Sequence, residues 1–82
     1  MSRFHIADAS QQPAAFAFSD EMRAEAEKHI AKYPPGRQQS AVMPLLDLAQ
    51  RQEGWVSAPA VAHIADMLDM AEIRVWEVVS FY

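Results

Sequence analysis

The chain has 82 residues, of which 51% are apolar, and eleven acidic residues against seven basic ones give a formal net charge of -4. A chain of this length holds one domain, and its negative charge without a basic cluster argues against a nucleic-acid backbone as ligand. Because cysteine is absent, no thiolate of these residues can hold zinc or an iron-sulfur cluster, and redox chemistry by this segment alone is excluded.

The first part of the chain, residues 1–17, carries Ala, Ser, Gln and Pro without a sustained apolar period. We expect a flexible N-terminal extension here, loosely attached to a helical domain that spans residues 18–82. This beginning lacks the continuous apolar core of a secretory signal, and apolar runs elsewhere fall far short of the roughly 20 residues that cross a bilayer. The sequence therefore predicts a cytoplasmic protein without direct membrane insertion.

A first helix is predicted over residues 20–32. Ser19 has the side chain of an N-cap, and acidic residues follow it at the positive end of the helix dipole. An apolar stripe recurs at steps of four: Phe18, Met22, Ala26 and Ile30. The charged residues mark the opposite, solvated face, and the segment from Tyr33 to Gly36, with two prolines, ends the helix.

A second helix is predicted over residues 37–53. Its core face follows the helical period: Val42, Leu45, Leu46 and Ala49. Pro44 leaves two alternatives, because it removes one hydrogen bond if the helix starts near Arg37 but sits cheaply in the first turn if Ser40 is the cap. We favour a single helix with a bend, ended by Gly54.

A third helix is predicted over residues 58–68. Ser57 is the expected N-cap, and Pro59 is tolerated in the first turn. The apolar spacing is that of a core face again: Val61, Ile64, Ala65 and Leu68. Trp55 and Val56 form a short extended link before it, and Asp69 and Met70 form a tight break after it.

A fourth helix is predicted over residues 71–81, which completes an all-α fold, a small bundle of three to four helices. One of its faces carries Val75, Val78, Val79 and Tyr82, and another carries Ile73 and Trp76. So wide an apolar surface suggests contact with additional protein, and we expect a neighbouring domain to cover Val75, Val79 and Tyr82. Dense β-branching leaves a strand as the minority alternative.

The sequence also ends on apolar residues without a polar tail, so we expect it to be the N-terminal part of a truncated two-part subunit. With its partner surface exposed, such a fragment should be marginally stable or should self-associate through the last helix.

Motifs that carry chemistry are weak. The histidines at 5, 29 and 63 lie far apart, there is no GxSxG serine, and there is no glycine-rich phosphate loop. We therefore expect no catalytic, cofactor-binding or metal-binding residue in these 82 residues.

Residues 61–81 have the outline of a helix-turn-helix. Their second helix would offer Glu72, Arg74 and Glu77 among apolar side chains, which is the wrong chemistry for base edges and phosphates. DNA binding and a stand-alone protein interaction module remain the alternative functions.

Several segments together carry a family resemblance: FSDEM, IAKYPPGRQQSAVMPLLDLAQRQEGWVS and MAEIRVWEVVSFY. Over residues 18–82 the chain resembles the N-terminal helical region of the 24 kDa iron-sulfur subunits of NADH:quinone oxidoreductase, respiratory complex I. It is similar also to the small subunits of NAD-linked hydrogenases and formate dehydrogenases, and the sequence does not separate these complexes.

The resemblance implies a helical bundle that precedes a thioredoxin-like domain with a 2Fe-2S cluster on four cysteines, none of which is present here. It implies a partner flavoprotein subunit that oxidises NADH through FMN, on the peripheral arm of a membrane-bound complex. This segment would then be a docking and scaffolding element, with structural or interface roles for Arg37, Pro44 and Trp55.

The chain departs from the family's pattern at two places. A glycine is usual at Leu68-Asp69, and a tyrosine is common at Trp76. The first departure bears on the shape of the turn between the last two helices, whereas the second exchanges one aromatic residue for another.

Overall fold

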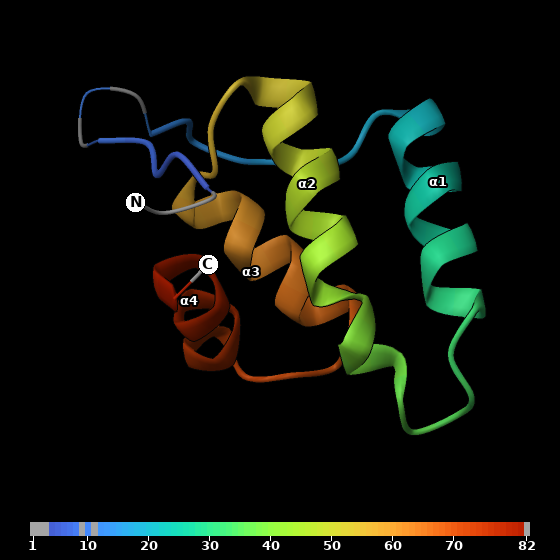
Figure 1. Cartoon of the computed structure of the whole chain (residues 1–82). Coiled ribbons are helices and arrows are strands. Elements are labelled where there is room, and N and C mark those ends of the chain that lie inside the picture. Colours follow the sequence, from blue (N-terminus) through green and yellow to red (C-terminus); the bar gives the residue numbers. More distant parts are fainter. Residues whose placement is uncertain (1–3, 9, 11, 82) are drawn as a thin grey trace.

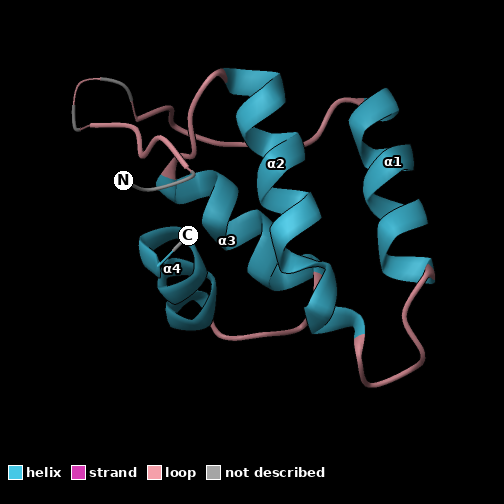
Figure 2. Ribbon diagram, in the orientation of Figure 1, coloured by secondary structure: helices cyan, strands magenta, loops and turns pink. Residues whose placement is uncertain are grey.

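The computed structural model describes residues 4–8, 10 and 12–81, and this part of the chain is built from helices (Figure 2). In chain order they are α1 (Asp20–Ala31), the 3₁₀ turn η1 (Gln38–Ala41), α2 (Val42–Glu53), α3 (Ala58–Met67) and α4 (Glu72–Phe81). The all-α prediction is confirmed, and the strand alternative for the last segment is wrong. No helix of the described residues has both the length and the apolar character needed to cross a membrane.

Helix α2 is the centre of the bundle, because it packs against α1, α3 and α4 (Figure 1). Helix α1 lies on one side of it, and α3 and α4 pack against each other on the other side. The two turns of the chain that the sequence marks most clearly, at Gly36 and Gly54, both have a positive φ, near 86° and 87°. Glycine adopts this left-handed conformation without steric cost. Gly54 is the C-cap residue of α2, as predicted, whereas Gly36 shapes the loop that follows α1.

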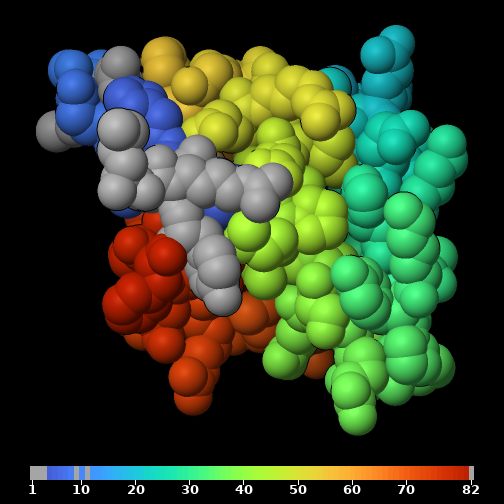
Figure 3. All heavy atoms as spheres, viewed as in Figure 1, coloured from blue at the N-terminus to red at the C-terminus, as the bar shows by residue number. Residues whose placement is uncertain are grey.

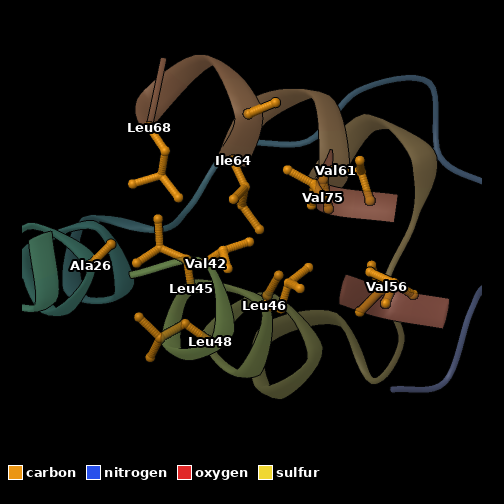
Figure 4. Packing of buried hydrophobic residues seen from close by; sticks show 14 of the residues in the cluster. Ala26, Val42, Leu45, Leu46, Leu48, Val56, Val61, Ile64, Leu68 and Val75 are labelled. Atoms are coloured by element: carbon orange, nitrogen blue, oxygen red, sulfur yellow. The ribbon is translucent and has the colours of Figure 1, made fainter. Parts of the chain in front are cut away.

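The core is formed where the predicted apolar faces meet (Figure 4). In this view Ile64 and Leu68 of α3 point toward Val42 and Leu45 of α2, while Ala26 approaches from α1. The fully buried side chains include Leu45, Leu46, Val56, Val61, Ile64, Val75 and Val79. Each of these large aliphatic side chains contributes about 1.5–3 kcal/mol through burial, so the contacts around α2 hold the domain together.

Both predicted serine caps are confirmed. The Ser19 hydroxyl accepts a hydrogen bond from the Met22 amide at 3.3 Å, and the Ser57 hydroxyl accepts one from the Ala60 amide at 3.2 Å. Each bond satisfies an amide that has no partner within its helix, and such a cap is worth about 1 kcal/mol.

Pro44 occupies a different place from the one we favoured. The expected single bent helix over residues 37–53 is instead a 3₁₀ turn followed by a separate helix that begins at Val42. Ala41 is the N-cap residue, without a side-chain bond, so Ser40 is not the cap of the alternative prediction either. Pro44 is the third residue of α2, where the missing amide would have had no helical partner, and this position explains why no kink is needed.

The turn between α3 and α4 is closed by two backbone hydrogen bonds. The Met70 amide donates to the Ala65 carbonyl at 2.9 Å, and the Asp69 amide donates to the Asp66 carbonyl at 3.2 Å. This pair of bonds defines a Schellman motif, whose central residue must be left-handed. Asp69 has a φ of 52°, so the turn keeps the backbone shape that favours glycine although an aspartate stands there.

The N-terminal segment contacts the bundle. Phe4 and Ala7 are 3% and 4% exposed, and Ile6 forms an isolated parallel β-bridge with Val56. These contacts differ from the loosely attached extension expected for residues 1–17, because two apolar side chains of the segment find a place in or beside the core. In Figure 1 the blue segment lies near the start of α3. The remaining residues of that prediction at 1–3, 9 and 11 lie outside the described part.

Glutamine side chains join this segment to the helices. The Gln52 side chain accepts from the Ser19 amide at 2.9 Å and donates to the Ala17 carbonyl at 3.0 Å. Gln50 Oε1 accepts from the His5 amide at 2.6 Å. An amide side chain has both a donor and an acceptor, so it can pair with an irregular backbone as a strand would.

Candidate docking surface

Helix α4 presents large apolar side chains to solvent. Ile73 is 64% exposed and Phe81 is 80% exposed. They lie at the two ends of one stripe, with Glu77 between them at steps of four residues, so all three project from the same side of the helix. We call Ile73, Glu77 and Phe81 the outer stripe of α4.

The opposite face of α4 is covered by the chain itself. Val75 and Val79 are fully buried, against the expectation that a neighbouring domain covers them. Helices α2 and α3 both pack on α4, which leaves no room on this face for another protein. The prediction for these two residues is therefore wrong, and Tyr82, the third residue of that face, lies outside the described residues.

The flanks of α4 are half-buried. Trp76 and Val78 both pack against the core cluster while part of each side chain stays accessible. Trp76 therefore borders the outer stripe, and the apolar surface of the helix continues from the core to solvent along its side.

Two of the three charged residues of α4 are paired with one another. Arg74 Nη1 lies 3.4 Å from Glu77 Oε1, with 70% and 45% of the two side chains exposed. Such exposed pairs contribute little to stability, between about 0 and 1 kcal/mol. The pair places a hydrated acidic group and a hydrated basic group beside the apolar side chains of the outer stripe, as in the polar rim of a protein interface.

The location of α4 makes the stripe accessible. The helix forms one flank of the molecule, and α1 forms the opposite flank (Figure 3). The basic side chain that a recognition helix would use, Arg74, is engaged with Glu77. The geometry thus suits apolar contact with protein better than contact with a phosphate backbone.

A hollow also lies between α1 and α2. It has a volume of about 390 Å³ and is lined by Glu21, Met22, Ala24, Glu25 and Arg51. Its walls are mixed in charge and open to solvent, so it offers a ligand little enclosure.

No group of three or more His, Cys, Asp or Glu side chains in the described part of the chain could hold a metal ion. The three histidines singled out in the sequence are not brought together: His5 is exposed near the N-terminus, and His29 lies in the last turn of α1. The ring of His63 packs edge-on against Phe16 and Phe18, with both centroid distances at 5.5 Å. His63 is therefore part of an aromatic cluster that attaches the segment before α1 to α3.

The structure places the three residues named by the family resemblance on different parts of the chain. Arg37 is exposed and precedes η1, Pro44 stands in the first turn of α2, and Trp55 is half-buried before Val56. Sequence reasoning missed the role of Gln50 and Gln52. Their signal was present as amide side chains two residues apart in the last turns of a helix, but nothing in the pattern identified their backbone partners.

Comparison with known proteins identifies the family to which the chain is similar. The sequence profile of the thioredoxin-like [2Fe-2S] ferredoxin family matches residues 26–82. The whole chain is 58% identical to a subunit of NADH-quinone oxidoreductase from Rhizobium meliloti (strain 1021). Over 68 residues, 82% of the chain, it is 48% identical to a subunit of NADH-quinone oxidoreductase from Rickettsia bellii (strain RML369-C). It is also 41% identical, over its full length, to the mitochondrial NADH dehydrogenase [ubiquinone] flavoprotein 2 of Dictyostelium discoideum.

The chain spans between 30% and 41% of the length of these three relatives. The matched profile nevertheless covers more than half of the chain, and it includes α2, α3 and α4 with the outer stripe. The chain therefore belongs to the thioredoxin-like [2Fe-2S] ferredoxin family.

Proposed function

We propose that these residues form the N-terminal helical region of a 2Fe-2S subunit of NADH:quinone oxidoreductase, and that the region docks this subunit onto neighbouring protein. The names of the relatives support the assignment to such a complex. The docking role rests on one observation, the exposure of Ile73 and Phe81 on the face of α4 that points away from the core.

Burial of the outer stripe of α4 by another protein surface would be energetically favourable. Burying two large apolar side chains contributes about 1.5–3 kcal/mol for each one, and the adjoining half-buried Trp76 enlarges the same surface. Side chains of this size are typical anchors of protein interfaces. The occupants proposed for this stripe are the thioredoxin-like domain of the same subunit and the flavoprotein subunit of the complex.

Cofactor chemistry is assigned to other parts of the complex. A 2Fe-2S cluster on four cysteines does not fit these residues, because the chain contains no cysteine. The proposal therefore places the cluster in the thioredoxin-like domain, and FMN and NADH in the flavoprotein. Oxidoreductase activity would belong to the assembled complex on its cytoplasmic peripheral arm, with no catalytic residue in this segment.

The test uses the full-length subunit, produced together with the flavoprotein subunit. Ile73→Glu and Phe81→Glu each place a charge on the outer stripe, and Ala24→Glu places the same charge on an exposed position of α1. We expect each stripe variant to reduce co-purification of the flavoprotein at least tenfold in relation to Ala24→Glu, because a buried carboxylate without a partner is costly.

Two results would contradict the docking role. One is full recovery of the flavoprotein with both stripe variants, which would rule out the flavoprotein as the occupant of the stripe and leave the thioredoxin-like domain as the proposed one. The other is the absence of flavoprotein binding by the unaltered subunit, which would favour a stand-alone interaction module instead.

A further inference from the structure

We propose that residues 4–7 are a detachable strand, and that the edge they occupy, formed by Gln50 and Val56, is a binding site for an extended peptide. The site is filled by the chain itself in this structure. This inference does not depend on docking by α4, because it concerns a different surface.

The backbone contacts are those of one isolated parallel β-bridge, the smallest unit of strand addition. The Val56 amide donates to the His5 carbonyl at 2.7 Å, and the Ala7 amide donates to the Val56 carbonyl at 2.9 Å. Both hydrogen-bonding groups of Val56 are therefore used by the segment, in a parallel bridge centred on Ile6 and Val56. Gln50 Oε1 continues this edge by accepting from the His5 amide at 2.6 Å. Extended peptides are recognised in this way at exposed strand edges.

The side chains give the site its specificity. Phe4 and Ala7 are almost completely buried, whereas His5 is exposed and Ile6 is 43% exposed. The edge therefore accepts a large apolar side chain and, three residues later, a small one. The two residues between them bind through their backbone groups while their side chains are exposed, so peptides with different residues at these two positions should bind similarly.

The strand is attached to the rest of the chain in a way that permits release. Between the strand and the buried Phe18, the exposed residues of the described chain are 8, 10, 12, 14, 15 and 17. Gln12 ties the start of this stretch to the bundle, because its side chain donates to the Ala7 carbonyl at 2.8 Å and accepts from the Ala58 amide at 2.9 Å. The end of the stretch is anchored separately, by Phe16 and Phe18 against His63, so the strand can leave while α1 stays in place. Segments with few buried anchors and exposed hydrogen bonds open locally, without unfolding of the whole domain.

Release of residues 4–7 would leave an open site at Val56 that favours binding of another extended segment. Val56 is fully buried in the closed state, and release of the strand uncovers its amide and carbonyl beside the apolar surface that held Phe4. A polar backbone group next to apolar surface is best satisfied by another extended segment. The expected partner is thus a peptide segment with a large apolar residue, two variable residues and a small apolar residue, which competes with residues 4–7.

Hydrogen exchange on the unaltered chain tests whether the strand is separable. Amide exchange followed by NMR at low urea concentrations should show Ala7 and Val56 exchanging together, at least tenfold faster than the buried α2 and α3 amides of Leu46 and Ile64. Their exchange should also depend little on urea, because a local opening exposes little surface. Exchange of all four amides at one rate with one urea dependence would overturn the proposal.

Peptide binding tests the site itself. A fluorescent peptide with the sequence of residues 1–8 should bind the Phe4→Ala chain at least tenfold more tightly than the unaltered chain, because the weakened strand leaves a larger fraction of sites open. Ile6→Ala is the matched control, since it alters an exposed side chain of the same strand, and it should leave the affinity near that of the unaltered chain.

A second peptide, in which alanine replaces Phe4, should not bind the Phe4→Ala chain. Equal affinity of both peptides, or no binding of the natural peptide to a Phe4→Ala chain that keeps its helical circular dichroism, would overturn the assignment of this edge as a peptide site.

Discussion

Asp69 is the one residue other than glycine with a positive φ in the described part of the chain. Its backbone belongs to the Schellman turn that joins α3 to α4, and its carboxylate lies at the negative end of the α3 dipole. Both circumstances are unfavourable for aspartate, because an L-residue with a side chain resists the left-handed region and a negative charge is repelled at a helix C-terminus.

Asp69→Gly should therefore raise the free energy of unfolding by about 0.5–1 kcal/mol, since glycine adopts this conformation without the steric cost. Urea unfolding followed by circular dichroism measures the change. Asp66→Gly is the control, because Asp66 has a helical backbone in the last turn of α3. Glycine gains nothing from a left-handed conformation there, and it should lower stability by only about 0.3 kcal/mol, the difference in helix propensity between the two residues. A loss of stability in both variants would show that the Asp69 side chain contributes more than its backbone costs.

The roles of the glutamines are not predictable from the local sequence pattern. Gln12, Gln50 and Gln52 each bond to backbone groups that lie between 5 and 46 residues away in the sequence. Local pattern predicts a capping serine, whose partner is three residues ahead. It does not predict a glutamine whose partner is reached only after the chain has folded back.

Helix α2 shows how one residue sets the boundary of an element. Pro44 lies within the first turn, where the helix has amides without internal partners, so its missing amide removes no hydrogen bond. In the single bent helix that we expected from the sequence, the same proline would lie in the interior and cost about 3 kcal/mol.

Pro44→Ala distinguishes the two arrangements. We expect the free energy of unfolding, measured by urea titration, to change by no more than about 0.5 kcal/mol. The amide that alanine introduces in the first turn of α2 would have no carbonyl partner within the helix. Leu45→Ala is the reference for a core change at the next position and should cost about 2–5 kcal/mol. A gain near 3 kcal/mol from Pro44→Ala would instead indicate a continuous helix through residues 37–53.

At the scale of the whole molecule, we expect the isolated chain to self-associate through the outer stripe of α4. Ile73 and Phe81 are exposed together, and two copies could cover these side chains mutually. Sedimentation velocity should show a rising average mass as the protein concentration increases. Ile73→Glu should shift this rise to at least tenfold higher concentration, whereas Ala24→Glu should not change it. A compact monomer at all concentrations would count against an adhesive stripe.

The candidate surface was only partly predictable. The sequence indicated that α4 has more apolar surface than one core face requires, and the exposure of Ile73 and Phe81 agrees with that. It assigned the free face to Val75 and Val79, however, although these residues are fully buried. Periodicity groups residues by face, but it does not tell which of two apolar faces meets the core, because that depends on how α2 and α3 pack.

The sequence was sufficient to predict the four α-helices, the serine caps of α1 and α3, the glycine end of α2, and the family, since these follow from residues that interact within a few positions or from motifs read directly. Three further features are settled only in the folded chain: which side of α4 remains open, that Phe4 and Ala7 reach the bundle, and that Val56 has a strand partner. These features join segments that are distant in the sequence, such as Ile6 and Val56, and such pairings form only when burial of apolar surface outweighs the entropy of closing long loops.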